Sequence, residues 1–198
     1  MKKLFAPVLC SFALACTLLV EGRAPRQSAA VAEASGVRLR GIDGKTYDIG
    51  EMRGSVILVS FGATWCLPCR GELAALEQLK KEYAGRPVRF LWVSIEGADE
   101  VSDRQLRDYA KGLKLTLPVL RDTTTRSAYS DFAARVPSPL KQSVRTPVPL
   151  VVFIDAAGRF SPPGHFGMTS SESYKAMVRA RLDSLLSGPK AEDKAGAR

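Results

Sequence analysis

The sequence is poor in histidine and cysteine, and both shortages exclude classes of site. His165 is the only histidine in 198 residues, and two of the four cysteines, Cys10 and Cys16, lie in the N-terminal apolar stretch. Only Cys66 and Cys69 lie in the body of the chain, so a framework of several disulfides is excluded. The same shortage leaves no second cysteine pair to complete a structural zinc site.

Long runs of basic residues are also missing. The formal net charge is +9, but no block of five or more Lys and Arg residues occurs. Because basic charge without a clustered patch argues against a nucleic-acid footprint, we expect no nucleic-acid partner. Hydrophobic residues make up 45% of the chain and charged residues 25%, which predicts a globular domain with a packed core.

The N-terminal segment has the layout of an export signal. A short positive start precedes an uncharged apolar run over residues 4–20. Three fates stay open: cleavage after Ala32, lipidation at Cys16, whose preceding residues resemble a bacterial lipobox, and retention of residues 4–20 as a membrane anchor. Each fate places the protein in the periplasm or on a membrane facing the outside. A buried N-terminal helix of the domain is the alternative.

The composition divides the chain into four segments. We expect an export signal or a membrane or lipid anchor over residues 1–20, a linker over 21–36, one domain over 37–188, and a disordered tail over 189–198.

Hydrophobic patterning predicts an α/β domain. Two alternating segments flank the turn at Asp43-Gly44 and predict an N-terminal β-hairpin. Further strands are predicted over residues 55–61, 88–95 and 150–154, with a partner strand starting at Arg159. Helices are predicted over residues 69–83, 102–111 and 123–134, and Gly112 is expected to end the second of them. A last helix is predicted to be capped by Ser171 or Ser173 and to end near residue 187. Alternating strands and helices predict a central sheet covered on both faces by helices.

The most specific signal is the segment Trp65-Cys66-Leu67-Pro68-Cys69, which follows a buried strand and opens a helix. A helix start presents unpaired N–H groups and the positive end of the macrodipole, and both stabilise a thiolate. Cys66 should therefore have a lowered pKa and act as the attacking sulfur. Cys69 lies one turn further on and should be the more buried, resolving thiol. Pro68 fixes the backbone where a helix start tolerates proline.

With these residues the chain resembles the TlpA/ResA-like thiol:disulfide oxidoreductases of the thioredoxin superfamily, over residues 37–186. The matching residues are the run 57–70, then Glu72, then Val148-Pro149, then 152–155 and Gly158. The resemblance implies a thioredoxin-like fold, in which helices flank a central mixed sheet that carries an N-terminal β-hairpin. It also implies that the Cys66–Cys69 disulfide is redox-active and that no other cofactor is needed.

The resemblance implies roles for residues around this pair. Pro149 corresponds to the cis-proline that faces the cysteines, with Pro147 as the competing candidate. Val148 would pair through its backbone with an incoming substrate. Trp65 would cover the disulfide, and together with Pro68 it completes the predicted substrate-binding set.

Glu72 resembles the acidic residue that this family carries near its cysteines. A partly buried carboxylate there should have a raised pKa and assist proton transfer to or from Cys69. A solvated first-turn glutamate, favoured by the helix dipole, is the alternative.

Some positions depart from the family pattern. Ser60 stands where thioredoxins carry a buried aspartate, Gly62 replaces a usual aromatic residue, and Leu73 stands where relatives often have proline. The stretch 127–148 is longer and richer in proline than expected, and we interpret it as a substrate-specific insert.

The predicted function is dithiol–disulfide exchange by an exported enzyme, in the direction of a reductase. Its partners would be exported proteins with thiols or disulfides, such as apoproteins in cytochrome maturation, and a membrane or periplasmic thiol donor. Because two thiolates and one histidine can bind copper, a metallochaperone is the main alternative. An interaction module without turnover is disfavoured because both cysteines are present. A peroxidase is disfavoured because peroxide-reducing relatives do not need a CxxC.

Overall fold

The computed structural model describes residue 34 and residues 36–122, 128–136, 147–168 and 170–188. The predicted export signal and C-terminal tail lie outside the described residues, as do residues 127 and 137–146 of the predicted insert. No helix within these ranges is long and apolar enough to cross a membrane. Ala34, in the segment predicted as a linker, is already buried, and its N–H donates to the Gly158 carbonyl at 2.9 Å.

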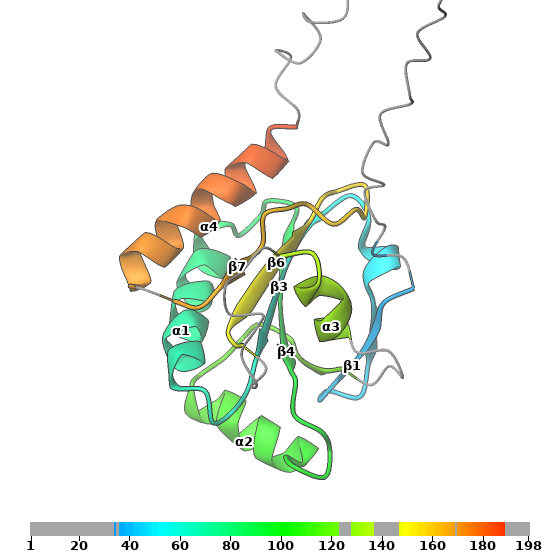
Figure 1. Cartoon of the computed structure of the whole chain (residues 1–198), viewed down its shortest axis with the longest axis vertical. Helices are drawn as coiled ribbons and strands as arrows, with labels where there is room; N and C mark the ends of the chain where they lie inside the picture. The colour runs from blue at the N-terminus through cyan, green and yellow to red at the C-terminus, as the bar shows by residue number, and fades with distance from the viewer. Residues whose placement is uncertain (1–33, 35, 123–127, 137–146, 169, 189–198) are drawn as a thin grey trace, which may run out of the picture. The chain divides into compact units, whose positions relative to one another are not determined.

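Within the described residues, strands and helices alternate along the chain (Figure 1). Their order is β1 (Arg38–Gly41), β2 (Thr46–Asp48), the 3₁₀ helix η1 (Ile49–Met52), β3 (Val56–Gly62), α1 (Leu67–Glu82), β4 (Val88–Ser94), α2 (Asp103–Gly112), β5 (Val119–Arg121), α3 (Ala128–Ala133), β6 (Leu150–Ile154), β7 (His165–Phe166) and α4 (Ser171–Leu186).

The strands form one mixed sheet in the order β2-β1-β5-β4-β3-β6-β7. β3, β4 and β5 run parallel, whereas β6 is antiparallel to β3, and β1 pairs antiparallel with both β2 and β5. The predicted mixed sheet and N-terminal hairpin are therefore confirmed. Because β3 and β4 are parallel neighbours, the residues that follow them lie at the same edge of the sheet.

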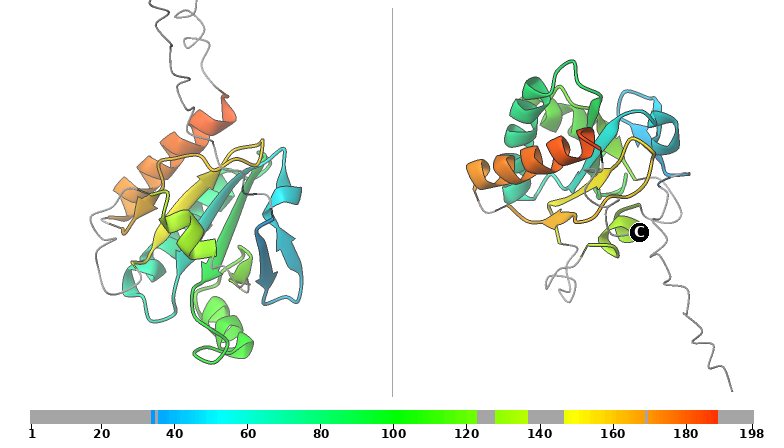
Figure 2. Two further views of the ribbon diagram at one scale, coloured as in Figure 1. Left: turned by 45° about the vertical axis from the view of Figure 1, so that its right-hand side comes forward. Right: turned by 90° about the horizontal axis from the view of Figure 1, so that it is seen from above.

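Helices cover both faces of the sheet. α1 and α4 lie side by side on one face, and α3 lies on the other (Figures 1 and 2). On the first face Leu76 of α1 and Val178 of α4 belong to one buried cluster with Trp92 of β4. On the second face Phe132 of α3 packs against Phe61 of β3, with ring centroids 5.9 Å apart. Burial on both sides explains why the central strands are continuously apolar.

Two predicted helix ends were wrong by small shifts. The last helix is capped by Ser170, not by Ser171 or Ser173, because the Ser170 hydroxyl accepts the Ser173 N–H at 3.2 Å. The second helix includes Gly112 as its final residue, and the left-handed backbone comes later, at Lys114 with φ of 55°.

The strand that pairs with β6 begins later than predicted. Phe160 makes only an isolated bridge to Ile154, and β7 starts at His165. Pro162 and Pro163 lie between them, and neither has an N–H to donate to the ladder.

Candidate active site

The cysteine pair lies at the start of α1, directly after the carboxyl end of β3. The sulfurs of Cys66 and Cys69 are bonded at 2.06 Å, with their Cα atoms 5.3 Å apart. Cys66 is the N-cap residue of α1, and its sulfur accepts the backbone N–H of Cys69 at 3.1 Å. This arrangement places the Cys66 sulfur at the positive end of the helix. On reduction the same N–H is in position to stabilise a Cys66 thiolate.

Apolar side chains cover most of the disulfide. Cys66 is 3% exposed and Cys69 is fully buried. Ile95, which follows β4, and Val148 pack against the pair. Trp65, which the resemblance assigns to covering the disulfide, is 63% exposed, and that role stays a prediction. The shielding comes from neighbouring segments of the sheet edge.

Val148 and Pro149 lie at that same edge. The peptide bond between them is cis, as expected for Pro149 from the family resemblance. The competing candidate, Pro147, contributes its carbonyl oxygen, which accepts the Tyr129 hydroxyl at 2.8 Å. Because β6 is antiparallel to β3, the start of β6 lies beside the end of β3, and Val148 thereby reaches the cysteines.

Exposed apolar side chains lie beside the disulfide in the sequence. Leu67 is 75% exposed and Trp65 is 63% exposed. Pro68, the second residue of α1, is also exposed. These three residues present apolar surface on both sides of Cys66 along the chain.

Glu72 is fully buried on α1, one turn after Cys69. Its Oε2 accepts the Ser60 hydroxyl at 2.7 Å, and its Oε1 accepts the Tyr174 hydroxyl at 2.6 Å. Burial raises the pKa of Glu72 to about 7, although the two hydrogen bonds from Tyr174 and Ser60 act to lower it. The alternative of a solvated first-turn glutamate is therefore wrong. Ser60, recognised only as a departure from the family pattern, is a direct partner of this carboxyl group.

Tyr174 is a residue that the sequence analysis missed. It comes from α4, 102 residues from Glu72, and is buried against it. Burial and the neighbouring Glu72 hold the pKa of Tyr174 well above its usual value, so its hydroxyl stays a proton donor. Nothing in the local sequence pattern indicates this pairing, because it arises from the packing of α4 on α1.

Glu96 is a second missed residue, and it holds the loop before Cys66. It follows β4, is buried, and accepts both the N–H and the hydroxyl of Thr64 at 2.7 Å. The Ser94 hydroxyl donates to the same carboxylate at 3.0 Å. The sequence did indicate this position, because an acidic residue that follows the second parallel strand lies at the same edge of the sheet as the cysteines that follow the first.

Glu96→Gln is expected to lower the free energy of unfolding by about 1–3 kcal/mol, because hydrogen bonds to a carboxylate are stronger than hydrogen bonds to a neutral amide. The matched control is Glu100→Gln on the same loop, an exposed side chain that accepts the Gly97 N–H at 2.8 Å. The control should change stability by less than about 0.5 kcal/mol. Urea unfolding of the oxidised proteins measures both, and equal losses would contradict the prediction.

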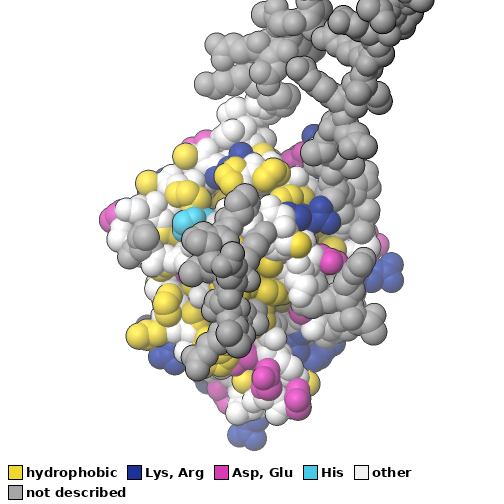
Figure 3. Space-filling model, in the orientation of Figure 1, with side chains coloured by type: hydrophobic (Ala, Val, Ile, Leu, Met, Phe, Trp, Pro, Cys, Tyr) yellow, Lys and Arg dark blue, Asp and Glu magenta, His cyan; other side chains and the backbone are white. Residues whose placement is uncertain are grey.

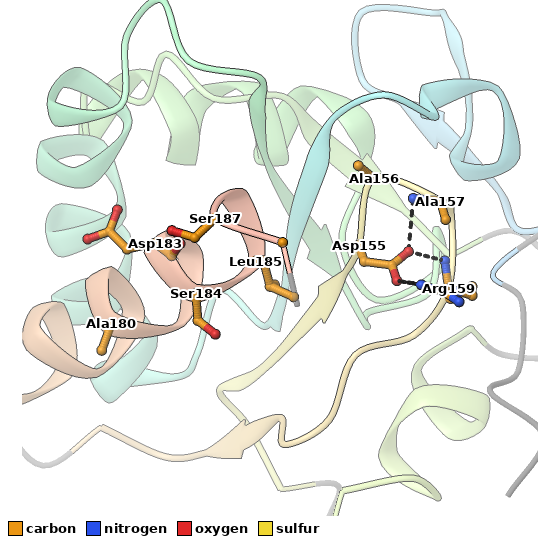
Figure 4. A pocket seen from close by; sticks show the side chains of 10 residues that line it. Asp155, Ala156, Ala157, Arg159, Ala180, Asp183, Ser184, Leu185 and Ser187 are labelled. Atoms are coloured by element: carbon orange, nitrogen blue, oxygen red, sulfur yellow. Dashed lines mark hydrogen bonds and ion pairs between the residues drawn. The ribbon is translucent and has the colours of Figure 1, made fainter. Parts of the chain in front are cut away.

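A surface pocket of about 890 Å³ lies at the other end of the sheet (Figure 4). Its charged residues are already paired. The Asp155 carboxylate accepts the Arg159 side chain and N–H groups of its own turn, all at 2.9 Å. Asp183 accepts from Tyr83 and Arg86 at 3.0 Å. These groups stabilise the surrounding structure, and we assign them no chemistry.

A metal site has no support from the side-chain arrangement. Among the residues that the structure describes, no three His, Cys, Asp or Glu side chains form a group that could hold an ion. His165 lies in β7, where it pairs with Val151 of β6. No observation therefore favours the copper alternative.

A family model described as the AhpC/TSA family matches residues 29–160. The thioredoxin-like protein YneN of Bacillus subtilis (strain 168) is 36% identical over 90 residues, which cover 46% of this chain and 52% of YneN. The thiol-disulfide oxidoreductase ResA of Oceanobacillus iheyensis is 32% identical over 81 residues, which cover 41% of this chain and 40% of ResA. The chain thus spans about half the length, or less, of these curated relatives.

A solved structure is similar over most of the domain. A thiol:disulfide interchange protein of the thioredoxin family from Chlorobium tepidum TLS superposes with a TM-score of 0.57 at 24% identity, over 76% of this chain and 98% of that one. The expected thioredoxin-like fold is therefore confirmed.

Proposed function

The chain belongs to the AhpC/TSA family, and on that premise we propose that it is an extracytoplasmic thiol:disulfide oxidoreductase acting through Cys66 and Cys69. The observation that carries the proposal is the disulfide at the start of α1, with Cys66 as the helix N-cap and Cys69 buried behind it. The ResA relative, named for the same reaction class, supports it.

Exchange proceeds through a mixed disulfide. The Cys66 thiolate attacks one sulfur of a substrate disulfide, so a bond forms between the two proteins and one substrate thiolate leaves. The Cys69 thiolate then attacks the Cys66 sulfur, closing the enzyme disulfide and releasing the second substrate thiolate. The substrate gains two electrons and the enzyme dithiol loses two. The two product thiolates take up protons from solution according to their pKa values.

Glu72 has the properties of a proton acceptor for Cys69. It lies one turn after Cys69 on α1, and its pKa of about 7 allows it to take up or release a proton near neutral pH. Ser60 and Tyr174 each donate to one of its oxygens and so fix the direction of the carboxyl group. We assign Ser60 and Tyr174 as positioning residues.

Other features of the chain support a proposal for its substrates and compartment. The signal-like residues 1–20 support export, with attachment through residues 4–20 or Cys16. Exported proteins with thiols or disulfides, including cytochrome-maturation apoproteins, are then the substrates, and a membrane or periplasmic thiol protein is the electron donor. Lys and Arg side chains are scattered over the face in Figure 3 instead of forming one patch, which supports protein substrates over nucleic acid.

Insulin reduction tests the proposal. With dithiothreitol as electron donor, the wild-type protein is expected to accelerate insulin precipitation, and Cys66→Ser to behave like the buffer alone, because the attacking sulfur is gone. Copper titration of the reduced wild-type protein runs beside it. Tight copper binding without insulin turnover would overturn the proposal in favour of a metallochaperone. The potential of the Cys66–Cys69 couple against glutathione tests the reducing direction.

A further inference from the structure

Gly62 and Trp92 meet beside the sulfur of Cys69. Gly62 ends β3, and Trp92 lies in the neighbouring strand β4, two residues before the partner of Gly62. A Cβ atom built on Gly62 would lie 2.7 Å from Trp92 Nε1 and 3.2 Å from Cys69 Sγ. The indole nitrogen and the buried sulfur therefore border the same small space, and the absence of a side chain at Gly62 lets both approach it.

This contact explains the departure at position 62 from the family pattern. An aromatic side chain at Gly62 would collide with the indole of Trp92, so the ring beside Cys69 comes from β4 instead. Tyr109 of α2 stacks on the indole, with centroids 5.8 Å apart and planes 27° apart, and holds its orientation. Trp92 thus occupies a defined position next to the redox pair.

A second observation concerns the indole N–H of Trp92, which is buried. Trp92 is fully buried, and its Nε1 has no hydrogen-bond acceptor among the residues that the structure describes. Most buried donors in folded proteins are paired, so an unpaired one next to a reactive group indicates a partner that arises in another state. A sulfur in a disulfide is a weak acceptor, whereas a thiolate is a strong, charged acceptor.

We propose that Trp92 Nε1–H donates a hydrogen bond to the Cys69 thiolate when the pair is reduced. The proposal rests on the function proposed above and names a further residue for that chemistry. When a donor thiolate attacks the Cys66 sulfur, the Cys66–Cys69 bond breaks and its electron pair leaves on Cys69 Sγ. The indole N–H donates a hydrogen bond to this negatively charged sulfur. Glu72 or water then supplies the proton that neutralises the Cys69 thiolate. Trp92 stabilises the charge, and Glu72 moves the proton.

Nuclear magnetic resonance of the indole N–H tests the contact without an activity assay. The Trp92 Hε1 resonance is observed in the ¹⁵N-labelled full-length protein and is assigned by its loss in Trp92→Phe. We expect this resonance to move downfield when the disulfide is reduced, and its position to follow the ionisation of Cys69. In Cys69→Ser this titration should vanish. A Trp92 Hε1 resonance that stays unchanged by reduction across the pH range of thiol ionisation would overturn the proposal.

The thiol–disulfide equilibrium with glutathione provides the second test. Trp92→Phe keeps an aromatic ring and removes the N–H, so it should favour the disulfide by about tenfold, equivalent to a potential about 30 mV more negative. The matched control is Tyr109→Phe, which keeps the stacked ring and the Trp92 N–H and should stay within about twofold of wild type. Equal shifts in the two variants, or none in Trp92→Phe, would overturn the proposal.

The experiments distinguish a failure of the Trp92 hydrogen bond from a failure of the proposed function. A wild-type protein that does not reduce insulin would overturn the oxidoreductase proposal, although the Trp92 Hε1 resonance could still follow Cys69. An active wild-type protein with an unresponsive Trp92 would overturn the hydrogen bond alone.

Discussion

Cys69→Ser is expected to accumulate as a mixed disulfide with its substrate, and to lower multiple turnover by at least about a thousandfold, because a serine hydroxyl cannot displace the bound sulfur. Cys66 keeps its position as the N-cap of α1 and can still attack once. Non-reducing electrophoresis and mass spectrometry detect the adduct, and insulin reduction measures the turnover.

The matched variant is Cys66→Ser, which removes the attacking sulfur and leaves Cys69 fully buried. It should form no adduct, because a substrate disulfide cannot approach the buried Cys69 sulfur closely enough for a bond to form. Adducts that form on Cys66→Ser and not on Cys69→Ser would show that the two cysteines have the opposite roles.

Relative to Glu72→Gln, the oxidised wild-type protein is expected to lose about 3 kcal/mol of unfolding free energy as the pH rises from below 4.5 to above about 7. The pKa of Glu72 is raised in the folded state because the carboxyl group is buried, so the folded protein holds this proton more tightly than the unfolded chain. The stabilisation is therefore complete below the unfolded pKa of 4.5 and is lost as the pH passes the folded value of about 7.

Urea unfolding of both proteins at several pH values measures this difference, and subtracting the variant cancels the titration of all other groups. Glu51→Gln, which removes an exposed carboxyl group in η1, is the control for the loss of one surface carboxylate. A constant difference between wild type and Glu72→Gln would mean that folding does not raise the pKa of Glu72.

The redox pair could be predicted from the sequence because its geometry is local. A strand that ends before a CxxC and a helix that begins within it place two sulfurs one helical turn apart, whatever the rest of the chain does. The same holds for the hairpin β1–β2 and for the apolar strands β3, β4 and β6, whose patterns depend on neighbouring residues. The assignment of Pro149 as the cis-proline came instead from the family resemblance, since no local rule distinguishes Pro149 from Pro147.

The residues around the pair depend on contacts between distant segments. Tyr174 reaches Glu72 only because α4 packs on α1, and Glu96 reaches Thr64 only because β4 lies parallel to β3. Such pairings carry no sequence periodicity. For the same reason the local sequence does not indicate that Ile95 and Val148 pack against the cysteines.

By itself, then, the sequence determined where the sulfurs lie and which of them stands at the positive end of a helix, since both follow from backbone geometry over a few residues. The tertiary structure alone decided what surrounds them. Glu72 is buried with a raised pKa, and the indole N–H of Trp92 lies beside Cys69, because the strand order and the helix packing bring together residues that no local interaction links.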